Sequence, residues 1–192
     1  MSYNTKWLYK RVVNNLNKKN IKEVSEILLI CLGVTFIFRF ALMPIKVDGS
    51  SMYPTLQDHD YAFMSRLNLN QIERFDVVTL NCKKLGNIII KRVIGLPGEK
   101  IVYKDDQLYV DNQKIEENFL DKNYIKKAKK EYNVSCFTED FEYTVGENEI
   151  FVLGDNRLNS LDSRLLGCFK EKDILSKKGI ILFPFKNMKE VN

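Results

Sequence analysis

Two residues of this chain, Ser51 and Lys91, have side chains that together can hydrolyse a peptide bond. The chain contains a single histidine, so it offers only one candidate for the histidine of a Ser-His-Asp triad. A lysine that is kept neutral can instead accept the proton of a serine hydroxyl and turn that serine into a nucleophile. We therefore predict a Ser-Lys dyad, provided that the fold brings the two side chains together.

The segment around Lys91 has the composition that a neutral lysine requires. A free lysine has a pKa of about 10.4, and burial can lower it by up to ~3–5 units. Three isoleucines precede Lys91, and Val93 and Ile94 follow it. In an extended strand Lys91 shares a face with Val93, whereas Arg92 points to the other side. The alternative is a lysine at the sheet surface beside Arg92, and this segment alone does not separate the two.

A second polar cluster, residues 154–164, directly follows an apolar run and holds two Asp, two Asn, two Arg and two Ser. Site residues are often carried by loops at the ends of strands. Asp162 and Arg164 are two positions apart, so in an extended chain they lie on one face and can pair. The alternative is a solvated loop without a role in a site.

The elements around these residues must position them. The first such element along the chain is an apolar segment before Ser51. Residues 27–43 contain one charge, Arg39, and end before Pro44. A helix of that length spans roughly 25 Å, which is near the lower limit for a bilayer core. We predict an uncleaved transmembrane anchor over 27–43. A buried core helix and a cleaved signal peptide are the alternatives.

The distribution of charge predicts the orientation of this anchor. Lysine and arginine are concentrated in residues 1–26, which indicates a basic arm on the cytoplasmic side. Residues 44–192 would then be extracytoplasmic, in a single-pass protein of the cell membrane with lipid as a partner. Residues 5–23 form either a short amphipathic helix on the membrane surface or a solvated arm. No basic stripe interleaved with aromatic residues lies elsewhere, so we expect no nucleic-acid partner.

After Pro44 the pattern is that of short strands with turns between them, which predicts a mainly β, largely antiparallel domain. Residues 104–147 are more polar and predict an insertion with weak strand content. The expected strands cover residues 76–80, 87–94, 100–103, 107–110, 149–153 and 179–183.

The four cysteines lie far apart, without a C-x-x-C motif, so neither a zinc site nor a dithiol redox site is indicated. We expect no metal and no cofactor. Scattered free thiols are the favoured interpretation, although one disulfide among Cys82, Cys136 and Cys168 stays open.

Taken in order, these segments resemble the conserved boxes of type I signal peptidases, which are membrane-anchored serine endopeptidases with a Ser-Lys dyad. The resemblance covers most of the chain and points to the short Gram-positive type. It implies a signal-peptidase-like β-rich catalytic core with a small inserted subdomain at about 104–147, preceded by one transmembrane helix. The matching segments are the anchor with residues 41–44, then 49–56, 74–78, 90–99 and 154–164.

The resemblance implies a role for individual residues. Ser51 would be the nucleophile and Lys91 its general base, with Ser160 hydrogen-bonded to the base and orienting it. Asp162 and Arg164 would form an ion pair that braces this region. The backbone N–H of Ser51 would be one oxyanion donor.

Further residues are implied around the oxyanion and the substrate: Gly49, Ser50, Met52, Ile89 and Ile90. Some family members have a serine at the position of Gly49, and its hydroxyl is the second oxyanion donor. Glycine offers no side chain there, so the second donor stays open.

Three positions depart from the family pattern: His59 and Phe75 stand where glycine is usual, and Leu158 replaces a polar residue. Histidine tolerates a positive φ better than most residues, so we expect the turn at His59 to persist.

The resemblance implies removal of N-terminal signal peptides from secreted preproteins that carry a small-x-small cleavage site. The peptide would bind as an extended strand beside the Lys91 strand and the segment before Ser51. One alternative is a related protein dedicated to pilin processing or pilus assembly, and another is a self-cleaving Ser-Lys repressor. A secretion translocase and a pilin are further candidate partners, while the substrate range and oligomeric state stay open.

Overall fold

The structure, a computed structural model, describes the backbone of residues 3–192 and the side chains of residues 18–192. The chain divides into two compact units, Met1–Ala41 and Leu42–Asn192. Each unit is described by itself.

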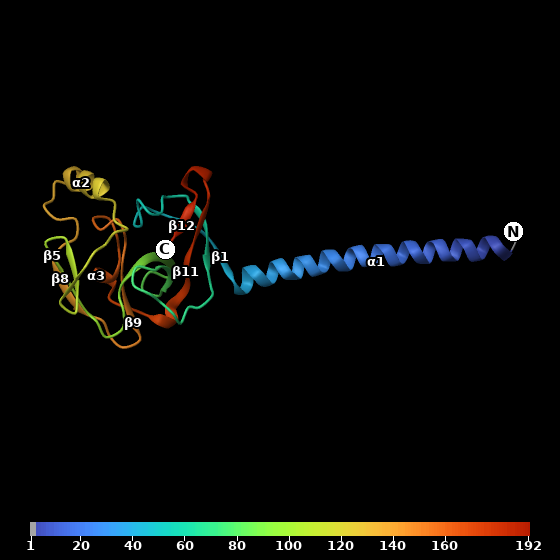
Figure 1. Ribbon diagram of the computed structural model, residues 1–192, viewed down its shortest axis with the longest axis horizontal. Coiled ribbons are helices and arrows are strands. Elements are labelled where there is room, and N and C mark those ends of the chain that lie inside the picture. The colour runs from blue at the N-terminus through green and yellow to red at the C-terminus, as the bar shows by residue number, and fades with distance from the viewer. Residues whose placement is uncertain (1–2) are drawn as a thin grey trace. The chain divides into compact units, whose positions relative to one another are not determined.

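The first unit is one continuous helix, α1 (Tyr3–Phe40), drawn in blue in Figure 1. The region 5–23 is therefore part of this long helix rather than a separate short one. Its large apolar side chains from Ile21 to Phe40 are 41% to 68% exposed. Among the described residues, no helix has a segment that is both long enough and apolar enough to cross a bilayer.

The helix ends at Phe40 and not at Met43, where the predicted anchor ended. Leu42 and Met43 instead begin a strand, and Met43 is buried in the core of the second unit. Pro44 accounts for part of this difference, because the residue before a proline is pushed toward extended backbone.

The second unit contains two antiparallel sheets, which confirms the predicted mainly β class. Figure 1 shows β5 and β8 of the smaller sheet on one side of this unit and β1, β11 and β12 on the other. The larger sheet has the order β1 (Leu42–Lys46), β2 (Tyr61–Ser65), β11 (Ile174–Phe183), β3 (Val77–Cys82), β4 (Asn87–Gly95), β9 (Glu149–Leu153) and β10 (Phe169–Lys170), with β12 (Lys189–Val191) paired to β11. The smaller sheet has the order β7 (Gln113–Ile115), β6 (Gln107–Val110), β5 (Lys100–Lys104) and β8 (Phe141–Thr144).

Short helices complete the unit: α2 (Lys122–Glu131), α3 (Ser163–Leu166) and two 3₁₀ turns, η1 (Glu171–Asp173) and η2 (Phe185–Asn187). The smaller sheet and α2 occupy the chain from Lys100 to Thr144, which overlaps the insertion expected at 104–147. This part has more regular structure than its polar sequence indicated.

Within the part of the chain that the structure describes, strand β4 has a pairing partner on both edges only in its second half, and this leaves an open strand edge beside the site. Its N-terminal half pairs with β3, for example Ile89 with Leu80 and Lys91 with Val78. Among the described residues, β9 joins the other edge only from Arg92 onward. The first half of β4 therefore keeps one open edge.

The residues after Ser51 are anchored in the apolar core. Met52 and Leu56 are almost completely buried, in one cluster with Met43 and Met64. Burial of side chains of this size contributes about 1.5–3 kcal/mol each. Because residues 49–56 contain the expected nucleophile, we call them the nucleophile turn, and its apolar members hold its backbone against β1 and β2.

Two of the departures from the family pattern have left-handed backbone. His59 has φ +68°, so the turn persists as expected. Phe75 has φ +74°, a conformation that costs a residue with a Cβ about 1–2 kcal/mol and that glycine adopts freely. The Phe75 ring packs against Phe119, with the centroids 5.0 Å apart, and this contact offsets part of that cost.

Candidate active site

Ser51 and Lys91 lie in direct contact. Lys91 Nζ donates hydrogen bonds to Ser51 Oγ at 2.7 Å and to the Ile90 carbonyl at 2.9 Å. Ser51 belongs to the nucleophile turn that follows β1, and Lys91 projects from the middle of β4. The Lys91 residue is only 4% exposed, which excludes the alternative of a lysine at the sheet surface.

The surroundings of Lys91 lower the pKa of its amine and so favour the neutral form. Burial lowers the pKa of Lys91 to about 8, although the carboxylates of Asp162 and Asp155 act in the opposite direction. With that pKa about a tenth of the molecules carry a neutral Lys91 at pH 7, compared with fewer than about one in a thousand for a free lysine. The amine can therefore act as a general base near neutral pH.

A groove of about 410 Å³ opens beside the dyad. One wall is formed by residues 43–48, which contain most of β1, and the other by residues 87–91 of β4. Ser51, Met52, Leu85 and Leu161 complete the lining. Of the predicted oxyanion and substrate positions, Met52, Ile89 and Ile90 line this groove, whereas Gly49 and Ser50 are not among its lining residues.

Asp162 and Arg164 form a bidentate ion pair beside the dyad. Arg164 Nε and Nη2 donate to the two carboxylate oxygens of Asp162 at 2.9 Å each. Asp162 also accepts from the Gly154 N–H at 3.0 Å and caps α3, so the pair forms at a helix start and not in an extended chain. Burial raises the pKa of Asp162, but Arg164 outweighs it and holds this pKa below its usual value.

The sequence as a whole matches known proteins along most of its length. Residues 21–183 match the family described as signal peptidase, peptidase S26. The chain belongs to this signal peptidase family. Signal peptidase I S of Bacillus subtilis (strain 168) is 38% identical over 93% of this chain and 98% of the relative. Signal peptidase I U of the same strain is 39% identical, with 91% and 95% covered. A signal peptidase I of Bacillus amyloliquefaciens is 39% identical, with 88% of each chain covered.

In this signal peptidase, one implied interaction is absent. Ser160 Oγ is buried and makes no hydrogen bond to Lys91, so the expected bond to the base is not present. The Ser160 hydroxyl instead helps to lower the pKa of Asp162. Lys91 Nζ is directed to Ser51 and to the carbonyl of Ile90 instead. Ser160 packs against Gly154, where any side chain would clash with both the Ser160 side chain and the Ser51 carbonyl. Gly154 thereby allows these two serines to approach.

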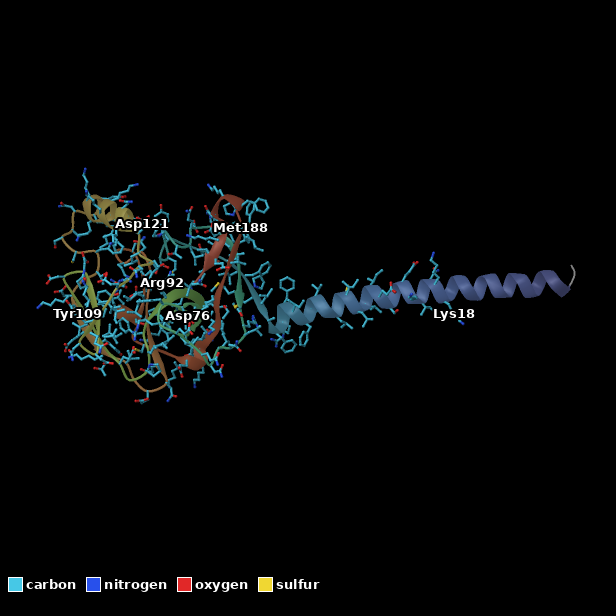
Figure 2. The ribbon with its side chains drawn as sticks, in the orientation of Figure 1. Lys18, Asp76, Arg92, Tyr109, Asp121 and Met188 are labelled. Atoms are coloured by element: carbon cyan, nitrogen blue, oxygen red, sulfur yellow. The ribbon has the colours of Figure 1, made fainter. Side chains whose placement is uncertain are left out.

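The polar cluster 154–164, called the site loop from here on, is not the solvated loop that the alternative interpretation described. Asp155 is fully buried and accepts from Arg92 Nε and Nη2 at 2.8 Å each. Thr55 Oγ1 of the nucleophile turn donates to the same carboxylate at 2.5 Å. Asp155 thus joins the strand that carries Lys91 to the turn that contains Ser51, and Figure 2 shows Arg92 within the second unit.

Asn156 makes a second connection between the site loop and the nucleophile turn. Its backbone N–H donates to the Ser51 carbonyl at 3.0 Å, and its Nδ2 donates to the Ser50 carbonyl at 3.1 Å. The sequence alone indicates no function for Asp155, Arg92 or Asn156. A single sequence gives no signal for which polar residues are buried. The clustering of Asp155 and Asn156 in the polar segment 154–164 is the one signal that could have pointed to them, and Arg92 in β4 lies outside this cluster.

The hydrogen-bond donors near Ser51 differ in whether they are free to bind an oxyanion. The Gly49 N–H donates to Asp58 Oδ1 at 2.9 Å and is therefore engaged. Within the described residues, the Ser51 N–H donates no hydrogen bond and remains available. Ser50 Oγ accepts from Asn159 Nδ2 at 3.1 Å, which leaves the Ser50 hydroxyl hydrogen for another acceptor.

All four cysteines of the signal peptidase are free thiols. The disulfide that the sequence left open among Cys82, Cys136 and Cys168 is therefore not formed.

Proposed function

We propose that this protein is a membrane-bound type I signal peptidase in which Ser51 is the nucleophile and Lys91 the general base. Membership of the signal peptidase family makes it a hydrolase that removes signal peptides from secretory preproteins. The observation that supports the dyad is the 2.7 Å hydrogen bond between Lys91 Nζ and Ser51 Oγ at the side of a groove.

The geometry supports the following sequence of steps. Neutral Lys91 takes the hydroxyl proton of Ser51 while Oγ attacks the carbonyl carbon of the scissile peptide bond. The Ser51 N–H stabilises the negative charge that develops on the carbonyl oxygen. The Lys91 ammonium then gives its proton to the leaving amine, and an acyl-enzyme remains. Lys91 next deprotonates a water molecule, whose oxygen attacks the ester carbonyl carbon. The bond from this carbon to Ser51 Oγ then breaks, the Lys91 ammonium returns its proton to Oγ, and the signal peptide is released.

The groove fits an extended peptide. Within the described residues, β1 pairs with β2 alone, and the first half of β4 pairs with β3 alone. A substrate strand placed between the two open edges gains backbone hydrogen bonds and brings its carbonyl to Ser51. The apolar side chains of Met43, Ile45 and Ile89 line the walls, which suits the small residues of a small-x-small site.

The exposed apolar surfaces support attachment to a membrane. We place the apolar C-terminal half of α1, within the expected anchor 27–43, in the bilayer, the basic arm 1–26 in the cytoplasm, and residues 44–192 outside it. The catalytic unit exposes Tyr61, Phe183 and Phe185, with Lys46 Nζ 5.9 Å from the Tyr61 ring centroid. Aromatic and lysine side chains of this kind are enriched at lipid interfaces. Carbonate extraction of cells tests the placement, because release of the protein into the supernatant would contradict it.

The direct test of the function is cleavage of a preprotein by the purified full-length chain in detergent. Sequencing of the new N-terminus should place the cut directly after a small-x-small motif. Intact preprotein after long incubation with folded enzyme would contradict the proposed function. A role restricted to pilin processing is not favoured by the relatives, which are named as signal peptidases I.

The pKa of Lys91 predicts how this activity depends on pH. Only the neutral amine accepts a proton, so kcat/KM should rise with pH and level off above about 8. Well below that value the neutral fraction, and with it kcat/KM, changes about tenfold per pH unit. Initial rates at low substrate concentration between pH 5.5 and 9.5 measure the profile. A profile that is flat across pH 6 to 8 would contradict a base with this pKa.

A further inference from the structure

Arg157 of the site loop is a charged residue with a fully buried side chain. It donates to the Gly154 carbonyl at 3.0 Å, Glu117 Oε1 at 2.6 Å, the Tyr103 hydroxyl at 2.8 Å and Thr138 Oγ1 at 3.1 Å. Three of these four acceptors belong to the part of the chain that holds the smaller sheet and α2. A buried guanidinium is tolerated only when its donors are satisfied, so the position of Arg157 depends on that part of the chain.

The position of Arg157 in turn affects the groups that hold Ser51. Asn156, the preceding residue, donates its backbone N–H to the Ser51 carbonyl at 3.0 Å. The Arg157 carbonyl accepts from Arg164 Nη2 at 2.8 Å, and Arg164 pairs with Asp162. A shift of Arg157 would therefore move both the contact to the nucleophile and the carboxylate near Lys91.

A second, separate contact reaches the nucleophile turn directly. The ring of Tyr53, two residues after Ser51, packs edge-on against Tyr124 of α2, with the centroids 5.0 Å apart. Tyr124 is itself held by the Phe137 ring at 5.9 Å. Asp121, labelled in Figure 2, caps the start of α2 by accepting from the Tyr124 N–H at 3.1 Å. The Tyr53 contact thus rests on an ordered helix start.

We propose that residues 117–138, which we call the insertion clamp, position Ser51 by holding the site loop through Arg157 and the nucleophile turn through Tyr53. The proposal rests on the proposed function, because it assigns a task within the same active site. Glu117 and Tyr124 touch neither Ser51 nor Lys91, so they are positioning residues and not catalytic ones. Displacement of a reacting group by about 1 Å can lower a rate by roughly 10²-fold, so these distant contacts can limit catalysis.

Two variants test the clamp, and each has a matched control in the same segment. Glu117→Gln removes the charge opposite Arg157 but keeps a side chain of the same size, and Glu116→Gln removes an exposed charge beside it. Tyr124→Ala removes the ring that contacts Tyr53, and Tyr132→Ala removes a half-exposed ring at the end of α2. The full-length chain is used throughout, with kcat and KM measured on a preprotein from pH 5.5 to 9.5 and the folded fraction measured by circular dichroism.

For Glu117→Gln and Tyr124→Ala we expect kcat/KM per folded molecule to fall roughly tenfold or more, mainly through kcat. In Glu117→Gln the acid limb of the pH profile should also move, since Asp155 and Asp162 of the site loop both affect the pKa of Lys91. Both control variants should behave as the unmodified chain does.

Two results would overturn the proposal. One is that Glu117→Gln and Tyr124→Ala match their controls after correction for folded protein. The other is a loss of activity in both variants that follows the unfolded fraction alone, with the acid limb of Glu117→Gln unchanged. If the unmodified chain cleaves no preprotein, the proposed function fails instead, and the two failures are thereby distinguished.

Discussion

Ser51→Ala should abolish preprotein cleavage, with kcat/KM falling by roughly 10³-fold or more toward the detection limit. The hydroxyl of Ser51 is the group that Lys91 Nζ contacts at 2.7 Å, so its removal leaves the base without a proton to accept. The variant should remain folded, because only one oxygen atom at the side of an open groove is lost. Cleavage followed by gel electrophoresis over several hours, with matched enzyme concentrations, measures the effect.

Substitutions of two other serines distinguish loss of the nucleophile from a general effect of removing a hydroxyl group. Ser50→Ala removes the neighbouring hydroxyl, which accepts from Asn159 and not from Lys91, so activity should stay within about tenfold of the unmodified chain. Ser135→Ala changes an exposed serine outside the groove and should have no effect. Full cleavage by Ser51→Ala, or abolition by Ser50→Ala alone, would show that the nucleophile has been assigned wrongly.

The fold was predictable from sequence where the strands are internal and apolar. The strands β4, β5, β6 and β9 appeared at the expected positions, because β-branched runs between turn residues are a strong local signal. β1 was not predicted, since its residues continue the apolar run of α1 and contain Pro44, and a proline weakens the sequence signal of a strand. The proline is tolerated because β1 lies at the edge of the larger sheet. α2 was missed as a regular helix because its polar, lysine-rich sequence resembles that of a loop.

The site was predictable only in part. The contact between Ser51 and Lys91 and the pairing of Asp162 with Arg164 are the contacts that the sequence and its resemblance indicated. The bond from Ser160 to Lys91 was expected and is absent. The burial of Arg157 could not be foreseen, because its partners lie on segments that come together only in the folded chain.

Lys91→Met should also abolish cleavage, and at the same time it should stabilise the folded chain. Methionine has a similar length, fills the same apolar site and carries no amine that could accept the Ser51 proton. The folded state holds the pKa of Lys91 at about 8, below its ordinary value of 10.5. Between these two values the unfolded chain binds more protons than the folded one, so stability increases as the pH rises through this interval.

At pH 7 Lys91 therefore lowers the free energy of unfolding by about 3 kcal/mol relative to a group that stays neutral, and at pH 9.5 by about 1 kcal/mol. Lys91→Met removes this effect but also loses the hydrogen bonds of Nζ, so the gain at pH 7 should lie between about 1 and 3 kcal/mol. Thermal unfolding of both full-length proteins at the two pH values measures the difference.

The dependence of the gain on pH distinguishes this explanation from better packing by methionine. A packing effect is independent of the protonation of position 91, so it would give the same gain at pH 7 and at pH 9.5. A gain that shrinks as the pH rises indicates that the folded chain tolerates a destabilising lysine because catalysis requires a base there. If the difference in stability between Lys91→Met and the unmodified chain is the same at pH 7 and at pH 9.5, the folded chain does not lower the pKa of Lys91, and the base that depends on this lowered pKa is wrong.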